Sequence, residues 1–220
     1  MDDATETAIR AALTAALQAG HADIQRGASA LDAVTTTITV LEDSPHFTAG
    51  RGAVFTADGY AELDASIMEW QLEHPNPWQM TGTVGAVALD QDGNLAAGTS
   101  TGGMTAKRYG RIGDSPIIGA GTYANASVGV SSTGHGEYFI RNVTADDIAA
   151  RMRYLDESLT DAAHAVIHET LTESGGTGGV IALGADGTVT MPFNTPGMYR
   201  GYVDAEGNET ITTYTGEGNV

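Results

Sequence analysis

The sequence has 220 residues, of which 28 are acidic and 10 are basic, so its formal net charge is -18. A chain of this length can bury a sizeable core, in one large domain or two small ones. Its acidic excess, with no run of Lys or Arg, argues against binding to nucleic acid or to an anionic membrane. The absence of cysteine excludes disulfides, a thiol nucleophile and Cys-ligated zinc.

Lysine is nearly missing from this acidic chain, because nine of its ten basic residues are Arg and only Lys107 is Lys. In 1 M salt the Debye length is about 3 Å, so the repulsion among the acidic side chains is screened. Such a surface therefore suits concentrated salt. We therefore expect a halophilic protein, the alternative being an acidic protein of an ordinary cytosol. The N-terminus lacks the basic-then-apolar order of a signal peptide, and apolar runs such as 84–89 are too short to span a bilayer. A soluble cytoplasmic protein is expected.

The first 44 residues have the apolar periodicity of two helices. Gly20 and Gly27 loosen the pattern of the first helix. The capping sequence Ser29-x-x-Asp32 begins the second, which ends before a Ser-Pro pair.

The middle of the chain is richer in strand patterns. Residues 69–82 have neither the periodicity of a helix nor that of a strand and are expected to form a loop. A hairpin turn is expected at Asp92-Gly93-Asn94. The expected strands are 53–56, 62–67, 84–89, 95–101 and 127–132.

Helices are expected again at 137–154 and 159–173, followed by strands at 180–183 and 188–191. Helices, a run of strands, helices and closing strands predict an α+β fold in which sheets pack together with helices outside, rather than alternating β-α units.

The stretch with the most chemical information is TGTVGAVALD at 81–90. Its Gly82-Thr83 pair stands where a loop enters a strand. Glycine permits the strained peptide geometry that an N-to-O acyl shift needs, and a freed threonine amine can act as base to its own hydroxyl. Taken alone, Thr83 is better explained as a β-branched residue that begins a strand.

Further motifs follow in order: LAAGTSTGGM at 95–104, GRIGDSPIIGAG at 110–121, STGHGE at 132–137 and MPFNTPGMYR at 191–200. Together with 81–90 they resemble the β-subunit of plant-type asparaginases/isoaspartyl peptidases, which are N-terminal-nucleophile hydrolases of the threonine type. GAVF at 52–55 and ELDASIM at 62–68 resemble the α-subunit of that family. The resemblance covers most of residues 28–202.

The resemblance implies a four-layer αββα sandwich in a single domain, 1–220, made as one chain that cleaves itself. Cleavage between Gly82 and Thr83 would give an α-chain of 1–82 and a β-chain of 83–220. Thr83 would then hydrolyse L-asparagine or β-aspartyl dipeptides, with its new α-amine as base.

The resemblance also implies roles for other residues. Arg111 and Asp114 match the clamp on the substrate's α-carboxylate and α-ammonium, although such a pair is more often a surface ion pair. Thr133 and Gly134 match the oxyanion hole, and Gly134 and Gly136 would let the substrate approach the backbone closely; ordinary tight turns also explain these glycines. Thr101 matches a second threonine beside the nucleophile.

Three histidines are candidates for a role in a site. His164 and His168 are four residues apart on an expected helix, which is a spacing for metal ligands, but no third ligand is apparent and no metal site is expected. His135 is next to the expected oxyanion residues and is expected to shape the pocket without a catalytic role.

The chain departs from the family in three places. It begins at the first helix, without the family's N-terminal His-Gly-Gly strand, and 69–82 is much shorter than the family's segment, so the fold is expected to be a truncated form with exposed strand edges. Thr48 replaces the asparagine of the family's Phe-Asn-Ala-Gly motif, which contacts the nucleophile region. Two alternatives stay open: an unprocessed, inactive relative that serves as a binding or structural module, and a glycosylasparaginase-like amidase.

The resemblance implies no cofactor, although a structural sodium ion held by loop carbonyls after the second helix is compatible with it. The expected partners are the small-molecule substrate and a second αβ unit in a dimer.

Overall fold

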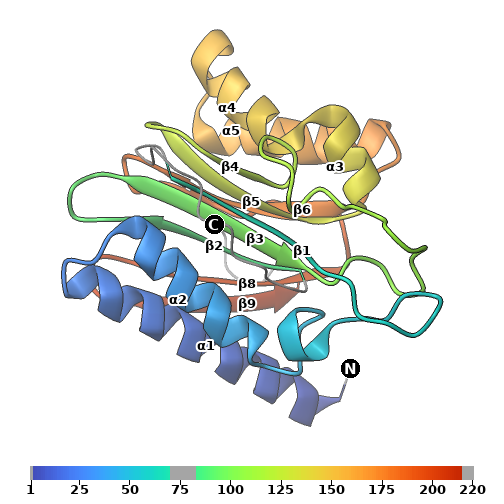
Figure 1. The fold of residues 1–220 in the computed structure, drawn as a ribbon. Coiled ribbons are helices and arrows are strands. Elements are labelled where there is room, and N and C mark those ends of the chain that lie inside the picture. The colour runs from blue at the N-terminus through green and yellow to red at the C-terminus, as the bar shows by residue number, and fades with distance from the viewer. Residues whose placement is uncertain (1, 70–82, 215–220) are drawn as a thin grey trace.

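The computed structural model describes residues 2–69 and 83–214. It has an α+β fold in which helices pack on antiparallel sheets, as the sequence predicts. Figure 1 shows the layers: α1 and α2 lie on one side, the sheets fill the middle, and α3, α4 and α5 lie on the other side. None of the helices in these two ranges is long and apolar enough to cross a membrane.

The two N-terminal helices are α1 (Asp3–Gln25) and α2 (Ala30–Glu42). The predicted cap of α2 is confirmed, because the Asp32 amide donates to Ser29 Oγ at 3.1 Å. Gly20 lies inside α1 instead of loosening it. A Cβ at Gly20 would be 2.1 Å from Thr37 Oγ1 on α2, so this glycine allows the two helices to pack closely.

The first sheet has the strand order β1-β3-β2. β2 (Val84–Leu89) and β3 (Leu95–Thr101) form the predicted hairpin, and β1 (Asp64–Glu69) pairs with the other edge of β3. The strand predicted at 53–56 is wrong, since that segment makes only a single bridge, from Phe55 to Ala61. Its backbone instead bonds to the loop after β3, where the Ala106 amide donates to the Phe55 carbonyl at 3.0 Å.

The second sheet has the order β4-β5-β6-β7. Its strands are β4 (Thr122–Ala124), β5 (Val128–Gly134), β6 (Gly178–Gly184) and β7 (Val189–Thr190). The two sheets face each other, and Thr99 of β3 shares a 2.6 Å hydrogen bond with Ser131 of β5 across the interface. A separate hairpin of β8 (Gly197–Val203) and β9 (Glu209–Tyr214), which the sequence did not predict, packs on α1.

The outer helices are α3 (Gly136–Asn142), α4 (Thr144–Leu155) and α5 (Leu159–His164), the last continuing as a π-helix, η2 (Ala165–Leu171). The single helix predicted at 137–154 is wrong. Val143 adopts the left-handed conformation, with φ 49° and ψ 47°, and separates α3 from α4. One apolar core lies between these helices and the second sheet, and another lies between α1, α2 and the first sheet.

Candidate active site

Thr83 immediately precedes β2, next to the end of β3. Its hydroxyl forms a short hydrogen bond with the hydroxyl of Thr101, the last residue of β3. Thr101 Oγ1 also accepts a hydrogen bond from the Gly103 amide at 2.9 Å. The pairing of β2 with β3 therefore holds the Thr83 hydroxyl against the Thr101 hydroxyl. Thr101 thus lies beside Thr83, where the sequence predicts it. Gly82, on the other side of the proposed cleavage point, lies outside the described residues.

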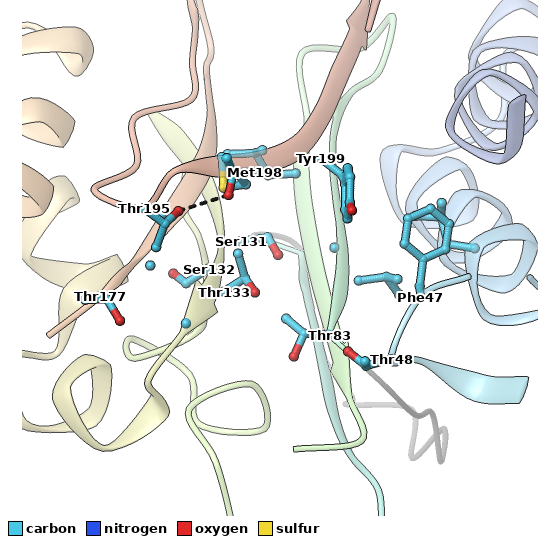
Figure 2. A pocket seen from close by; sticks show the side chains of 18 of the residues that line it. Phe47, Thr48, Thr83, Ser131, Ser132, Thr133, Thr177, Thr195, Met198 and Tyr199 are labelled. Atoms are coloured by element: carbon cyan, nitrogen blue, oxygen red, sulfur yellow. Dashed lines mark hydrogen bonds between the residues drawn. The ribbon is translucent and has the colours of Figure 1, made fainter. Parts of the chain in front are cut away.

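A pocket of about 500 Å³ opens beside Thr83. Thr133 and Gly134 at the end of β5 line it, together with Thr48 from the loop after α2 (Figure 2). The structure thus brings the predicted nucleophile, the two oxyanion candidates and Thr48 to one cavity. His135 also lines it, as expected, and its Nδ1 lies 3.1 Å from Thr177 Oγ1.

Gly134 has a structural reason to be glycine that the sequence did not reveal. Its φ is 148°, and a Cβ there would lie 2.3 Å from the Thr177 carbonyl oxygen. β5 and β6 are antiparallel neighbours in the sheet, and Gly134 pairs with Gly178 where β5 ends and β6 begins. Close packing of the two strands therefore requires glycine and fixes the backbone at the pocket.

Arg111, Asp114 and Gly136 form a second cluster, which does not line the described wall of the pocket. A Cβ at Gly136 would lie 2.7 Å from Asp114 Oδ1 and 3.3 Å from Arg111 Nη2, so the three residues are in close contact. Arg111 Nε donates to Glu137 Oε1 at 2.8 Å. The three predicted residues therefore do come together, with Glu137 as a partner that the sequence did not predict.

Asp114 is buried, with 5% of its surface exposed, and its Oδ2 has no hydrogen-bond partner among the described residues. Burial raises the pKa of its carboxyl to about 6, and the nearby Arg111 guanidinium opposes that rise. The hydrogen bond from Arg111 lowers the pKa of Glu137. A buried carboxylate with an unused oxygen suits a site that receives a cation.

Two further residues bond to backbone groups near this cluster. Asp64 of β1 accepts a hydrogen bond from the Gly113 amide at 2.9 Å, which ties the loop carrying Arg111 to the first sheet. Lys107, the single lysine of the sequence, is buried and donates to the carbonyl of Gly102 at 2.7 Å and to that of Glu62. Sequence reasoning noticed Lys107 only for its rarity and missed this structural role.

His164 and His168 lie elsewhere, beside a second cavity on the outer helices. Their rings are 5.1 Å apart, and burial, together with the neighbouring His164, lowers the pKa of His168. Within the described parts of the chain, no three His, Cys, Asp or Glu side chains are placed to hold a metal ion together.

The chain is similar to known proteins, and this similarity bears on the function of the pocket and of the Arg111 cluster. The family model described as asparaginase matches residues 1–75 and 70–213. The chain belongs to the asparaginase family. It is 39% identical to the isoaspartyl peptidase of Escherichia coli strain K12, over 94% of this chain and 89% of that protein. It is 32% identical to the isoaspartyl peptidase/L-asparaginase of Xenopus laevis, over 96% of this chain and 91% of that one.

These matches also locate the predicted shortening. The alignment with the E. coli protein runs over 286 positions, whereas this chain has 220 residues, so at least 66 aligned positions lack a counterpart here. The family model matches in two segments that meet at 70–75. The missing positions therefore fit the segment just before Thr83.

Proposed function

We propose that the protein is a self-processing amidohydrolase that acts on L-asparagine and β-aspartyl dipeptides through Thr83. The contact between the Thr83 and Thr101 hydroxyls, at the edge of the pocket lined by Thr133 and Gly134, is the observation that carries this proposal. Membership of a family whose members are named isoaspartyl peptidase or L-asparaginase supports the same activity. The arrangement of helices, two sheets and helices is consistent with the αββα sandwich of N-terminal-nucleophile hydrolases.

The proposed activation step is cleavage of the Gly82–Thr83 peptide bond. It leaves Thr83 with a free α-amine, which takes the proton from the Thr83 hydroxyl as that oxygen attacks the substrate amide. Thr101 hydrogen bonds to the same oxygen and holds it in position. No other base is required, because nucleophile and base belong to one residue.

The proposed oxyanion hole consists of the Thr133 hydroxyl and the Gly134 amide. Both belong to the end of β5, and the packing of β5 against β6 fixes their backbone. Donors held in advance at the point where negative charge develops stabilise the tetrahedral intermediate. The amine then leaves with a proton, and water hydrolyses the threonine ester to release aspartate.

The proposed substrate clamp is the cluster of Arg111 and Asp114. The guanidinium suits the substrate's α-carboxylate and the buried carboxylate suits its α-ammonium. Glu137 accepts a hydrogen bond from Arg111 Nε, so within residues 2–69 and 83–214 the two terminal nitrogens are left for a second carboxylate. Gly136 allows substrate to approach between the two side chains, since a Cβ there would contact both.

The chemistry proposed here uses residues of the chain alone. A structural sodium ion would be held by carbonyls of the loop after α2, where the Pro45 and Phe47 carbonyl oxygens both lie close to Gly52. We also infer a dimer of αβ units from the family resemblance.

The test is aspartate release from L-asparagine and from β-aspartyl-leucine. We expect turnover by the purified protein in molar salt and none by Thr83→Ala, while Thr160→Ala, at an exposed position on α5, retains it. The second candidate function is an inactive binding module, which the shortening before Thr83 favours. A folded protein without turnover of either substrate would support that candidate.

A further inference from the structure

A buried lysine lies close behind the two threonines of the site. The residue, Lys107, is 5% exposed although its side chain ends in an ammonium group. Within residues 2–69 and 83–214 no carboxylate forms an ion pair with it. Its Nζ instead donates to two backbone carbonyls, that of Gly102 at 2.7 Å and that of Glu62. Burying a charge without a counter-charge is costly, and the chain does so one peptide group away from Thr101.

The peptide group between Gly102 and Gly103 connects Lys107 to Thr101. Its carbonyl oxygen belongs to Gly102 and accepts the hydrogen bond from Lys107 Nζ. Its N–H belongs to Gly103 and donates to Thr101 Oγ1 at 2.9 Å. Thr101 Oγ1 in turn contacts the Thr83 hydroxyl. The ammonium, the peptide group and the two hydroxyls therefore form one continuous chain of hydrogen bonds that ends at the proposed nucleophile.

The surrounding backbone holds this peptide group against the ammonium. The Gly102 amide donates to the Thr48 carbonyl at 3.2 Å, and a Cβ at Gly102 would lie 2.9 Å from the same oxygen. Gly103 has φ 68°, in the left-handed region that favours glycine. A Cβ at Gly103 would lie 3.3 Å from Lys107 Nζ. Both glycines therefore allow the close approach on which the chain of hydrogen bonds depends.

The contact between the two threonines allows either hydroxyl to be the donor. The charge of Lys107 favours one direction. Hydrogen bonds in series strengthen one another, so a cation on the Gly102 carbonyl makes the Gly103 N–H a stronger donor to Thr101 Oγ1. An oxygen that accepts a stronger hydrogen bond is a poorer acceptor for a second one and a better donor of its own proton. Thr101 then donates to Thr83 Oγ1, which leaves the Thr83 proton to face the Thr83 amine.

We propose that Lys107 is a positioning residue that sets the direction of the hydrogen bond between Thr101 and Thr83. The inference rests on the proposed function and adds a residue that acts on the nucleophile through Thr101. As Thr83 Oγ1 bonds to the substrate carbonyl carbon, its proton passes to the Thr83 amine, while Thr101 and Lys107 keep their protons. A Thr83 hydroxyl that donated to Thr101 would first have to turn.

The first test is a double-mutant cycle on kcat for L-asparagine in molar salt, expressed per cleaved chain. Lys107→Met removes the charge and the donor, and kcat should fall about tenfold, the effect of one hydrogen bond to a charged group. Because Lys107 acts through Thr101, the double variant with Thr101→Val should be no slower than Thr101→Val alone. Losses that multiply are the result of a merely structural role and would overturn the inference.

Three further variants or readouts sharpen this test. Arg108→Met removes the same charge from an exposed side chain of the same loop and should leave kcat unchanged. Lys107→Gln keeps an N–H donor without the charge, and a kcat equal to that of the wild type would overturn the inference. So would a folded Lys107→Met that stays uncleaved while Thr101→Val is cleaved. A raised KM with unchanged kcat would assign Lys107 to the clamp beside Arg111 instead, and would overturn it too.

A second test does not depend on turnover. In protein with isotope-labelled glycine, the amide proton resonance of Gly103 should move upfield in Lys107→Met, because its N–H becomes a weaker donor. The resonance should stay in place in Arg108→Met. An unchanged resonance in Lys107→Met would overturn the inference. Wild-type protein that hydrolyses neither L-asparagine nor β-aspartyl-leucine would overturn the proposed function, and the Gly103 resonance would still report on the hydrogen bonds.

Discussion

Replacing Asp114 with Asn should stabilise the fold at neutral pH while removing the proposed clamp for the substrate ammonium. The Asp114 side chain is buried, its Oδ2 lacks a partner among the described residues, and burial raises its pKa from 3.8 to about 6. An acid with a higher pKa in the folded chain binds its proton more tightly when folded. Its ionisation therefore destabilises the fold, increasingly so as the pH rises from 3.8 through 6.

The size of this effect follows from the two pKa values. Linkage gives a penalty near zero at pH 3, about 1–2 kcal/mol at pH 5 and about 3 kcal/mol at pH 8. The amide of Asn is neutral throughout, so its contacts contribute a constant that does not change with pH. The change in unfolding free energy on Asp114→Asn should therefore be about 1–2 kcal/mol more favourable at pH 8 than at pH 5.

The assay is urea unfolding of both proteins at pH 5 and pH 8 in one high-salt buffer. Asp156→Asn, at an exposed position after α4, is the control for removing one negative charge from the surface. The same substrate assays should show a raised KM for Asp114→Asn. A mutational effect that is equal at the two pH values would refute the burial argument.

Three further predictions concern the site and the surface. Thr101→Val keeps the side-chain shape but removes the hydroxyl that contacts Thr83, so kcat for asparagine should fall roughly 10- to 100-fold with little change in KM. An unchanged kcat would contradict the role of Thr101 in positioning the Thr83 hydroxyl. Gly134→Ala places a Cβ 2.3 Å from the Thr177 carbonyl oxygen and should lower the free energy of unfolding in urea by about 2–4 kcal/mol. The control Gly187→Ala, also at positive φ but in open space, should lower it by about 1 kcal/mol. Equal losses in the two variants would count against the steric explanation. With a net charge of -18, the thermal midpoint should rise from dilute buffer to molar salt, and a flat profile would argue against halophily.

The parts of the fold that local signals determine could be predicted from the sequence. The β2–β3 hairpin has short apolar runs on both sides of an Asp-Gly turn, and α2 begins at a side-chain cap. The break at Val143 could not be predicted, because a β-branched residue rarely adopts the left-handed conformation and no Gly, Asn or Pro marks the position. The β8–β9 hairpin was missed as well: Arg200, which stacks 4.6 Å from the Phe193 ring centroid, interrupts the apolar pattern.

The candidate site likewise contains residues that the sequence predicted and residues that it did not. Thr83, Thr133 and Gly134 were chosen from motifs, and the structure places them at one pocket. The pair of Arg111 and Glu137 joins residues 26 positions apart, and Lys107 binds a carbonyl 45 positions away. Contacts of that range depend on how the sheets and loops pack, and a single sequence carries no local signal for them.

The central claim is that Thr83 becomes an N-terminal nucleophile, and intact-mass spectrometry of the purified protein in high salt tests it most directly. The account predicts two fragments, 1–82 and 83–220, from wild-type protein and a single chain from Thr83→Ala. A folded wild-type protein that stays intact at 22.7 kDa would contradict it.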